Sequence, residues 1–235
     1  MLKFFKMLIG VALLPACWAV SVATYNLYRL SGESGTPDGF RAWSLPAGFV
    51  LWVLIFFLLP RPSRTYVLGH ELTHAMWALM MGGGVGKLKV GRNGGHVELT
   101  KTNFVITLAP YFFPFYTFFV IAAYYLAGIW LEVEPYMAWW LGAVGFTWAF
   151  HITFTLNMLA DRQPDIQEHG RIFSYVIICL MNVLVIGIWM VLVGSPKLGS
   201  YSELLAHEHA LAYNYTRRLV ISAWLYVAEF VGNLK

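Results

Sequence analysis

Apolar runs long enough to reach across a lipid bilayer occupy most of this 235-residue chain. A transmembrane helix needs roughly 20 predominantly apolar residues, and runs of about that length recur at 7–28, 43–60, 65–81, 103–130, 136–160 and 172–194, with a weaker one at 219–233. Hydrophobic residues make up 59% of the chain and charged residues only 12%. We therefore expect an all-α polytopic membrane protein with about six to seven hydrophobic helices.

Little of the chain lies outside these runs, so we expect a single membrane domain over residues 1–235 rather than an added soluble domain. The formal net charge is +4, from 16 Lys and Arg residues against 12 Asp and Glu residues. In a chain with so few charges, such an excess is typical of membrane orientation. It argues against nucleic-acid binding.

The pattern changes between Gly82 and Thr100. Two short stretches there alternate between apolar and polar residues, Lys87-Leu88-Lys89-Val90 and His96-Val97-Glu98-Leu99. Asn93-Gly94-Gly95 lies between them, and such residues accept the positive φ angles of a tight turn. The sequence therefore predicts a small β-hairpin after the 65–81 helix.

The motif His70-Glu71-Leu72-Thr73-His74 carries the most chemical information. On a helix, residues i and i+4 project from one face, so both imidazoles can bind one Zn²⁺ while Glu71 acts as general base. Glu71 is also the only charged residue between Thr65 and Gly86. An ionisable group in such an apolar segment indicates a functional site. The alternative is a pair of interfacial histidines with a glutamate that favours the start of a helix.

A catalytic zinc ion needs a third protein ligand and keeps its fourth position for water. The acidic segment 161–170 is the main source of candidates. Asp165 follows Pro164, which suits the first turn of a helix, and acids at such a position also occur for purely structural reasons. Asp165 is our first candidate, Asp161 the second, and Glu168 and His169 rank below them.

These features resemble the site-2 protease family of intramembrane zinc metalloproteases. The similarity covers about residues 65–175, taken as a metalloprotease-like core, and includes the histidine motif, the glycine-rich hairpin, Ala109-Pro110 in the next run and the later acidic segment. It implies that His70, His74 and Asp165 bind zinc and that Glu71 activates water. The chain lacks the family's Leu-Asp-Gly around the third ligand, where only Asn157 and Pro164-Asp165 correspond, and it lacks a PDZ-like insertion.

Membrane topology limits how the motif and Asp165 can meet. If the 65–81 helix crossed the bilayer fully, two further crossings would leave His70 and Asp165 on opposite sides. We therefore expect the helix and the hairpin to form a re-entrant unit that returns to its starting side, which requires a protein-lined or water-filled cavity.

The basic residues agree with that topology. The side of the N-terminus would hold Lys3, Lys6, Arg61, Arg64, Lys87, Lys89, Arg92, Lys101, Arg162 and Arg171. The opposite side would hold only Arg29, Arg41, Lys197, Arg217 and Arg218. The positive-inside rule then makes the N-terminal side cytoplasmic. We expect a multi-pass protein, in a bacterial-type inner membrane, with both metal-binding elements on the cytoplasmic side.

The remaining histidines have structural interpretations. His151 lies inside an apolar run, where a lone histidine is most often a hydrogen-bonded core residue. His96 could approach the site, although an exposed position on a strand is the simpler expectation. His207-Glu208-His209 has the wrong spacing for one helical face, so we expect a solvated or interfacial helix over Ser202–Arg218.

The sequence thus predicts an intramembrane zinc metalloprotease that hydrolyses peptide bonds of membrane-embedded substrates near the cytoplasmic side. Its partners would be membrane-protein or peptide substrates and the lipid bilayer. One alternative is a proteolytically silent zinc-binding membrane protein with a structural or regulatory role, against which the presence of Glu71 argues. The other is an ion or proton transporter, although the chain shows no paired repeats of broken helices.

Overall fold

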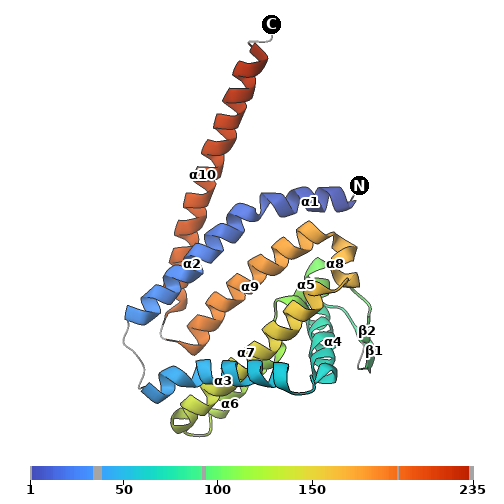
Figure 1. Ribbon diagram of the computed structural model, residues 1–235, viewed down its shortest axis with the longest axis vertical. Helices are drawn as coiled ribbons and strands as arrows, with labels where there is room; N and C mark the ends of the chain where they lie inside the picture. Colours follow the sequence, from blue (N-terminus) through green and yellow to red (C-terminus); the bar gives the residue numbers. More distant parts are fainter. Residues whose placement is uncertain (1, 34–38, 92–93, 195, 233–235) are drawn as a thin grey trace.

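The computed structural model describes residues 2–33, 39–91, 94–194 and 196–232. The chain is mostly helical with one small sheet (Figure 1). The α-helices are α1 (Leu2–Ala12), α2 (Leu14–Glu33), α3 (Gly39–Leu58), α4 (Ser63–Met80), α5 (Phe104–Leu108), α6 (Phe115–Ala127), α7 (Met137–Ala160), α8 (Pro164–His169), α9 (Arg171–Val193) and α10 (Leu198–Gly232). Two 3₁₀ turns, η1 (Ala109–Tyr111) and η2 (Glu134–Tyr136), and the strands β1 (Val85–Val90) and β2 (Gly95–Leu99) complete the fold.

Three helical segments are long and apolar enough to cross a membrane, which supports the expected membrane protein. They are Leu2–Ser31, Glu134–Ala160 and Arg171–Val193. A fourth is obtained if the bent pair Phe104–Tyr111 and Phe115–Ala127 counts as one span. The expected six to seven hydrophobic helices are therefore not confirmed in the described part of the chain. The helix over Trp43–Leu58 is apolar but shorter, and α4 is not among the candidate spans.

A sharp bend divides the apolar run 103–130, which the sequence suggested as one hydrophobic segment. The two halves meet at 81°. Pro110 and Pro114 lie at the break, and proline lacks the N–H that a continuous helix needs. The bend lets η1 turn toward α4 instead of continuing along α6.

The β-hairpin is confirmed. Strands β1 and β2 pair antiparallel, with Leu88 opposite Val97 and Lys89 opposite His96. Gly94 has φ +147°, a conformation that L side chains rarely adopt, as the predicted turn requires. Arg92 and Asn93 lie outside the described residues. Both strands pack against α4, so the motif helix and the hairpin form one unit; its depth in a bilayer stays a prediction.

Helices α3 and α7 make the most extensive helix pair (Figure 1). Glycines allow their backbones to approach closely. A Cβ atom on Gly48 would lie 1.9 Å from the carbonyl oxygen of Gly142, and one on Gly145 would lie 2.1 Å from that of Leu45. Small residues at helix interfaces of membrane proteins permit this close contact. The pair fixes α7, whose Phe150 and Phe154 pack with Tyr66 and Val67 of α4.

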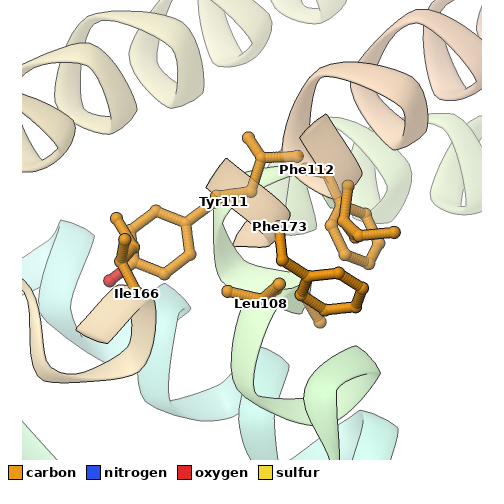
Figure 2. Close-up of a cluster of buried hydrophobic side chains, with 8 residues drawn as sticks. Leu108, Tyr111, Phe112, Ile166 and Phe173 are labelled. Atoms are coloured by element: carbon orange, nitrogen blue, oxygen red, sulfur yellow. The ribbon is translucent and has the colours of Figure 1, made fainter. Parts of the chain in front are cut away.

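A buried cluster joins the broken helix to α8 and α9. Leu108, Tyr111 and Phe112 pack with Ile166 of α8 and Phe173 of α9 (Figure 2). The cluster holds the start of α8. The sequence places Pro164 in the first turn of the helix that enters the 172–194 run, whereas in the structure Pro164 begins α8, a separate helix that ends at His169.

The α8–α9 junction fixes α8 further. Gly170, with φ +89°, separates α8 from α9. The hydroxyl of Ser174 donates a 3.1 Å hydrogen bond to the carbonyl of Ile166, which ties α8 to the first turn of α9.

Helix α10 continues without a break through the segment expected to be a solvated helix and through the weak apolar run 219–233 as far as Gly232. Its first half packs on α2, where Tyr201 and Thr24 form a buried hydrogen bond of 3.0 Å. Its second half projects beyond the rest of the molecule (Figure 1).

Candidate metal centre

Helix α4 presents the two motif histidines side by side, as their spacing predicts. The Nε2 atoms of His70 and His74 lie 3.2 Å apart. A carbonyl oxygen can only accept a hydrogen bond, so the 2.8 Å contact between His74 Nδ1 and the carbonyl of Ile106 places a hydrogen on Nδ1. In the neutral imidazole, Nε2 then keeps its lone pair and can bind a metal.

The third ligand candidate comes from α8. Asp165 Oδ2 lies 3.5 Å from His70 Nε2 and 3.7 Å from His74 Nε2. Three such atoms at these distances could hold one metal ion between them. Zinc bonds of about 2.0–2.2 Å at a tetrahedral angle would set the ligand atoms about 3.3–3.5 Å apart. The observed separations of 3.2, 3.5 and 3.7 Å in this triangle of atoms lie around that range.

The other acidic-segment candidates lie elsewhere. Asp161 and Glu168 line the same cleft but are outside the group of potential ligands. His169 is buried and faces α1, where its Nδ1 accepts a hydrogen bond of 2.6 Å from Lys6 Nζ. In the described part of the chain, His70, His74 and Asp165 are the one group of His, Cys, Asp and Glu residues that could hold a metal ion.

Asn103 and α5 support the orientation of His74. The Asn103 side chain caps α5, accepting hydrogen bonds of 2.9 Å from the backbone N–H groups of Val105 and Ile106. Ile106 is fully buried, and its carbonyl is the one that accepts from His74. A ligating histidine is usually held through its second ring nitrogen in this way.

Tyr111 is a site residue that the sequence analysis missed. Its hydroxyl donates a 2.9 Å hydrogen bond to Asp165 Oδ2, the same oxygen that completes the triangle. Its backbone carbonyl accepts a 2.9 Å bond from Asn182 of α9, and its ring meets His70 edge-on at 5.4 Å. Pro110 and Pro114 in an apolar run were the available signal, because they indicate a broken helix at this position.

Asp165 and the two histidines influence one another's ionisation. Burial opposes ionisation of Asp165, yet the two adjacent imidazoles outweigh it and hold the pKa of Asp165 well below its usual range. Burial alone would lower the pKa of His74, but its contacts with Asp165 and with the carbonyl of Ile106 raise it above the ordinary value. The negative charge of Asp165 therefore favours a cation at the two imidazoles.

Glu71 lies beside the triangle and under the hairpin. It is buried, and burial raises the pKa of its carboxyl, an effect that His70 and His74 only partly offset. Gly95 of β2 passes so close that an added Cβ would lie 2.7 Å from Glu71 Cγ. The absence of a side chain at this position therefore lets the hairpin cover the glutamate.

A cleft of about 630 Å³ opens over the three ligand candidates and Glu71. Helix α4, strand β2, the start of α5 and the 161–168 segment line it. Its volume is typical of a ligand pocket. His96 stands on β2 as an exposed residue at the cleft, whereas His207 and His209 are exposed on α10.

His151 lies in α7 on another side of α4. Its side chain is buried, as expected for a core histidine, but its Nε2 atom has no hydrogen-bond partner among the residues that the structure describes. It lines a second, much smaller cavity together with His70.

Comparisons of this chain with protein-family models, curated proteins and solved structures find no match.

Proposed function

We propose that this chain is an intramembrane zinc metalloprotease similar to the site-2 proteases. The observation that carries the proposal is the convergence of His70 Nε2, His74 Nε2 and Asp165 Oδ2 within 3.2–3.7 Å, with Glu71 beside them. Two imidazoles and one carboxylate form a donor set that suits zinc, and three protein ligands are the number used by catalytic zinc sites.

Each residue of the centre has a defined task in this proposal. Bound zinc supplies a Lewis acid that polarises the scissile carbonyl and makes water a stronger nucleophile near neutral pH. The carboxylate of Glu71 takes a proton from the attacking water and returns it to the leaving amine. Ile106 and Tyr111 keep His74 and Asp165 oriented through the hydrogen bonds described above. A structural zinc site has no need for the base, so Glu71 favours the protease over a silent zinc-binding protein.

A peptide substrate has to enter the cleft in an extended form, because a helix hides its own amide groups. Strand β2 lines the cleft and belongs to a sheet of two strands in the described structure. Its second edge can therefore add a substrate strand through backbone hydrogen bonds. A transmembrane segment that unwinds locally beside Glu71 is the substrate class that this arrangement suits.

The proposal also includes a multi-pass orientation with a cytoplasmic N-terminus, as in a bacterial-type inner membrane. Lys6 of α1 contacts His169 at the end of α8, so the basic N-terminal helix lies at the same end of the molecule as the candidate centre. Basic residues accumulate on the cytoplasmic side of membrane proteins. Cleavage near that side is the expected consequence.

The direct test compares peptide hydrolysis with bound metal. Purified full-length chain in detergent, loaded with zinc, is expected to cleave a model transmembrane peptide. Glu71→Gln is expected to keep its zinc and lose cleavage, because the base is lost and the ligands remain. Glu203→Gln, on the exposed surface of α10, serves as the matched control and should cleave normally. Cleavage by Glu71→Gln at the wild-type rate would contradict the proposal.

A further inference from the structure

The two motif histidines differ at the ring nitrogen that faces away from the triangle. His74 Nδ1 donates to the carbonyl of Ile106. His70 Nδ1 is fully buried and has no partner among the described residues. When Nε2 of His70 serves as a metal ligand, Nδ1 carries the hydrogen. A buried N–H group without a partner is costly, so an additional acceptor is needed near His70.

A small cavity beside His70 can hold a water molecule that supplies this acceptor. The volume that the centre of a water molecule can occupy in it is about 20 Å³. One buried water needs about 10–15 Å³ of such volume. This space accommodates one water molecule beside His70. His151 of α7 lines it from the opposite helix, and its buried Nε2 also lacks a partner in the described structure.

We infer that one water bound in this cavity bridges His70 and His151, which makes His151 a positioning residue for the candidate metal centre. The inference rests on the proposed function, because it assigns His70 as a ligand. The water accepts a hydrogen bond from His70 Nδ1–H and donates one to His151 Nε2. This tautomer of His151 carries its hydrogen on Nδ1.

Thr73 completes the surroundings of the water. Thr73 lines the same cavity, and its hydroxyl donates a 2.7 Å hydrogen bond to the carbonyl of Gly69, which leaves its oxygen able to accept. The water then has three polar partners, the usual number for a buried water.

A metal ion suits this cavity less well than water does. The described residues that line it include no acid, and its walls are largely aromatic, with Tyr116 and Phe150 among them. A cation there would also face the N–H of His70 rather than a lone pair. A neutral bridging molecule that both accepts and donates agrees with the two unpartnered nitrogens.

The bridge would link the metal centre to a candidate membrane span. His151 belongs to α7, which α3 holds through the close contacts at Gly48 and Gly145. On another side, the His70 ring meets Tyr111 edge-on. The ring would thus be fixed by α7 through the water and by η1 through an aromatic contact. Removal of the acceptor on His151 frees the ring to rotate away from the ligand geometry.

The test measures the zinc dissociation constant of the full-length chain in detergent by competition with a chromogenic chelator. His151→Phe keeps an aromatic ring but has no acceptor, and we expect it to bind zinc about 10- to 100-fold more weakly, the usual loss for an outer-shell partner. His151→Gln provides an amide oxygen and should recover most of the affinity. His207→Phe makes the same change on the exposed surface of α10 and should have no effect.

A second measurement separates positioning from general damage. With Co²⁺ in place of zinc, the visible absorption bands are expected to shift in His151→Phe and to return in His151→Gln. Thr73→Val removes one partner of the water while keeping the side-chain size, and it should weaken zinc binding less than His151→Phe does. This variant tests the inference if His151→Phe does not fold. Wild-type affinity in both His151→Phe and Thr73→Val would overturn this inference alone. A wild-type chain that binds no zinc would overturn the proposed function and this inference with it.

Discussion

The hydroxyl of Tyr111 is the most informative single group to remove. Tyr111→Phe deletes the donor that lies 2.9 Å from Asp165 Oδ2 and leaves the fully buried ring in place. A hydrogen bond to a charged group contributes about 1.5–3 kcal/mol. At about 1.4 kcal/mol per tenfold change in affinity, zinc binding should weaken by about 10- to 100-fold. The Asp165 side chain is 25% exposed, so water can replace part of the lost bond. We expect a result near the tenfold end.

The assay is a chelator competition on the full-length chain, with thermal unfolding followed in parallel. Tyr124→Phe is the matched control, because its hydroxyl donates to the carbonyl of Val133 at 3.3 Å, away from the centre. Its zinc affinity should equal that of wild type. If Tyr111→Phe binds zinc within about twofold of wild type, which is under 0.5 kcal/mol, the reasoning about Asp165 is refuted.

Three further predictions follow from the same geometry. Gly95→Ala places a Cβ atom 2.7 Å from Val67 Cγ1 and Glu71 Cγ, and overpacking of about 1–3 kcal/mol should reduce peptide cleavage more than zinc content. Gly199→Ala, with open space around it, should leave both cleavage and zinc content unchanged. Gly170→Ala forces an L residue to φ +89° and should lower the free energy of unfolding by about 1–3 kcal/mol in thermal denaturation. Because the pKa of His74 is raised, its protonation stabilises the protein without zinc at pH values below about 6.5, the pKa in the unfolded chain, and this stability is lost as pH rises through the folded pKa. Zinc affinity should rise over the same pH interval, because the proton leaves the nitrogen that binds the metal. A zinc affinity that falls as pH rises would contradict the last of these.

Local patterns in the sequence were sufficient to predict the motif helix and the hairpin. The spacing of His70 and His74 sets both rings on one helical face wherever the helix lies. The alternation in 87–90 and 96–99 with an intervening glycine turn likewise determines a hairpin from neighbouring residues alone. These elements are confirmed because their geometry depends on few distant contacts.

Long-range contacts determine which other residues lie beside the two histidines. Sequence reasoning restricted the third ligand to the 161–169 segment, but the choice of Asp165 depends on how α8 sits on α9, through the Ser174 bond and the turn at Gly170. Tyr111 reaches Asp165 across 54 residues of sequence, and no local pattern encodes that contact. Its position follows from the bend in the 103–130 run.

How the apolar runs divide into helices could not be predicted for a related reason. Hydropathy measures how apolar a run is and not whether the helix stays straight, so the 81° bend near Pro110 and Pro114 was not counted. The 65–81 run became α4, whose polar motif residues keep it outside the set of candidate spans.

The central claim is that His70, His74 and Asp165 bind one zinc ion, and metal analysis of the purified protein tests it most directly. The full-length chain, prepared in detergent without chelators, is expected to contain stoichiometric zinc by mass spectrometry. His74→Ala is expected to contain none, since two of the three ligands cannot form a stable centre. Absence of stoichiometric zinc from the wild-type protein, or equal zinc in His74→Ala, would contradict the account.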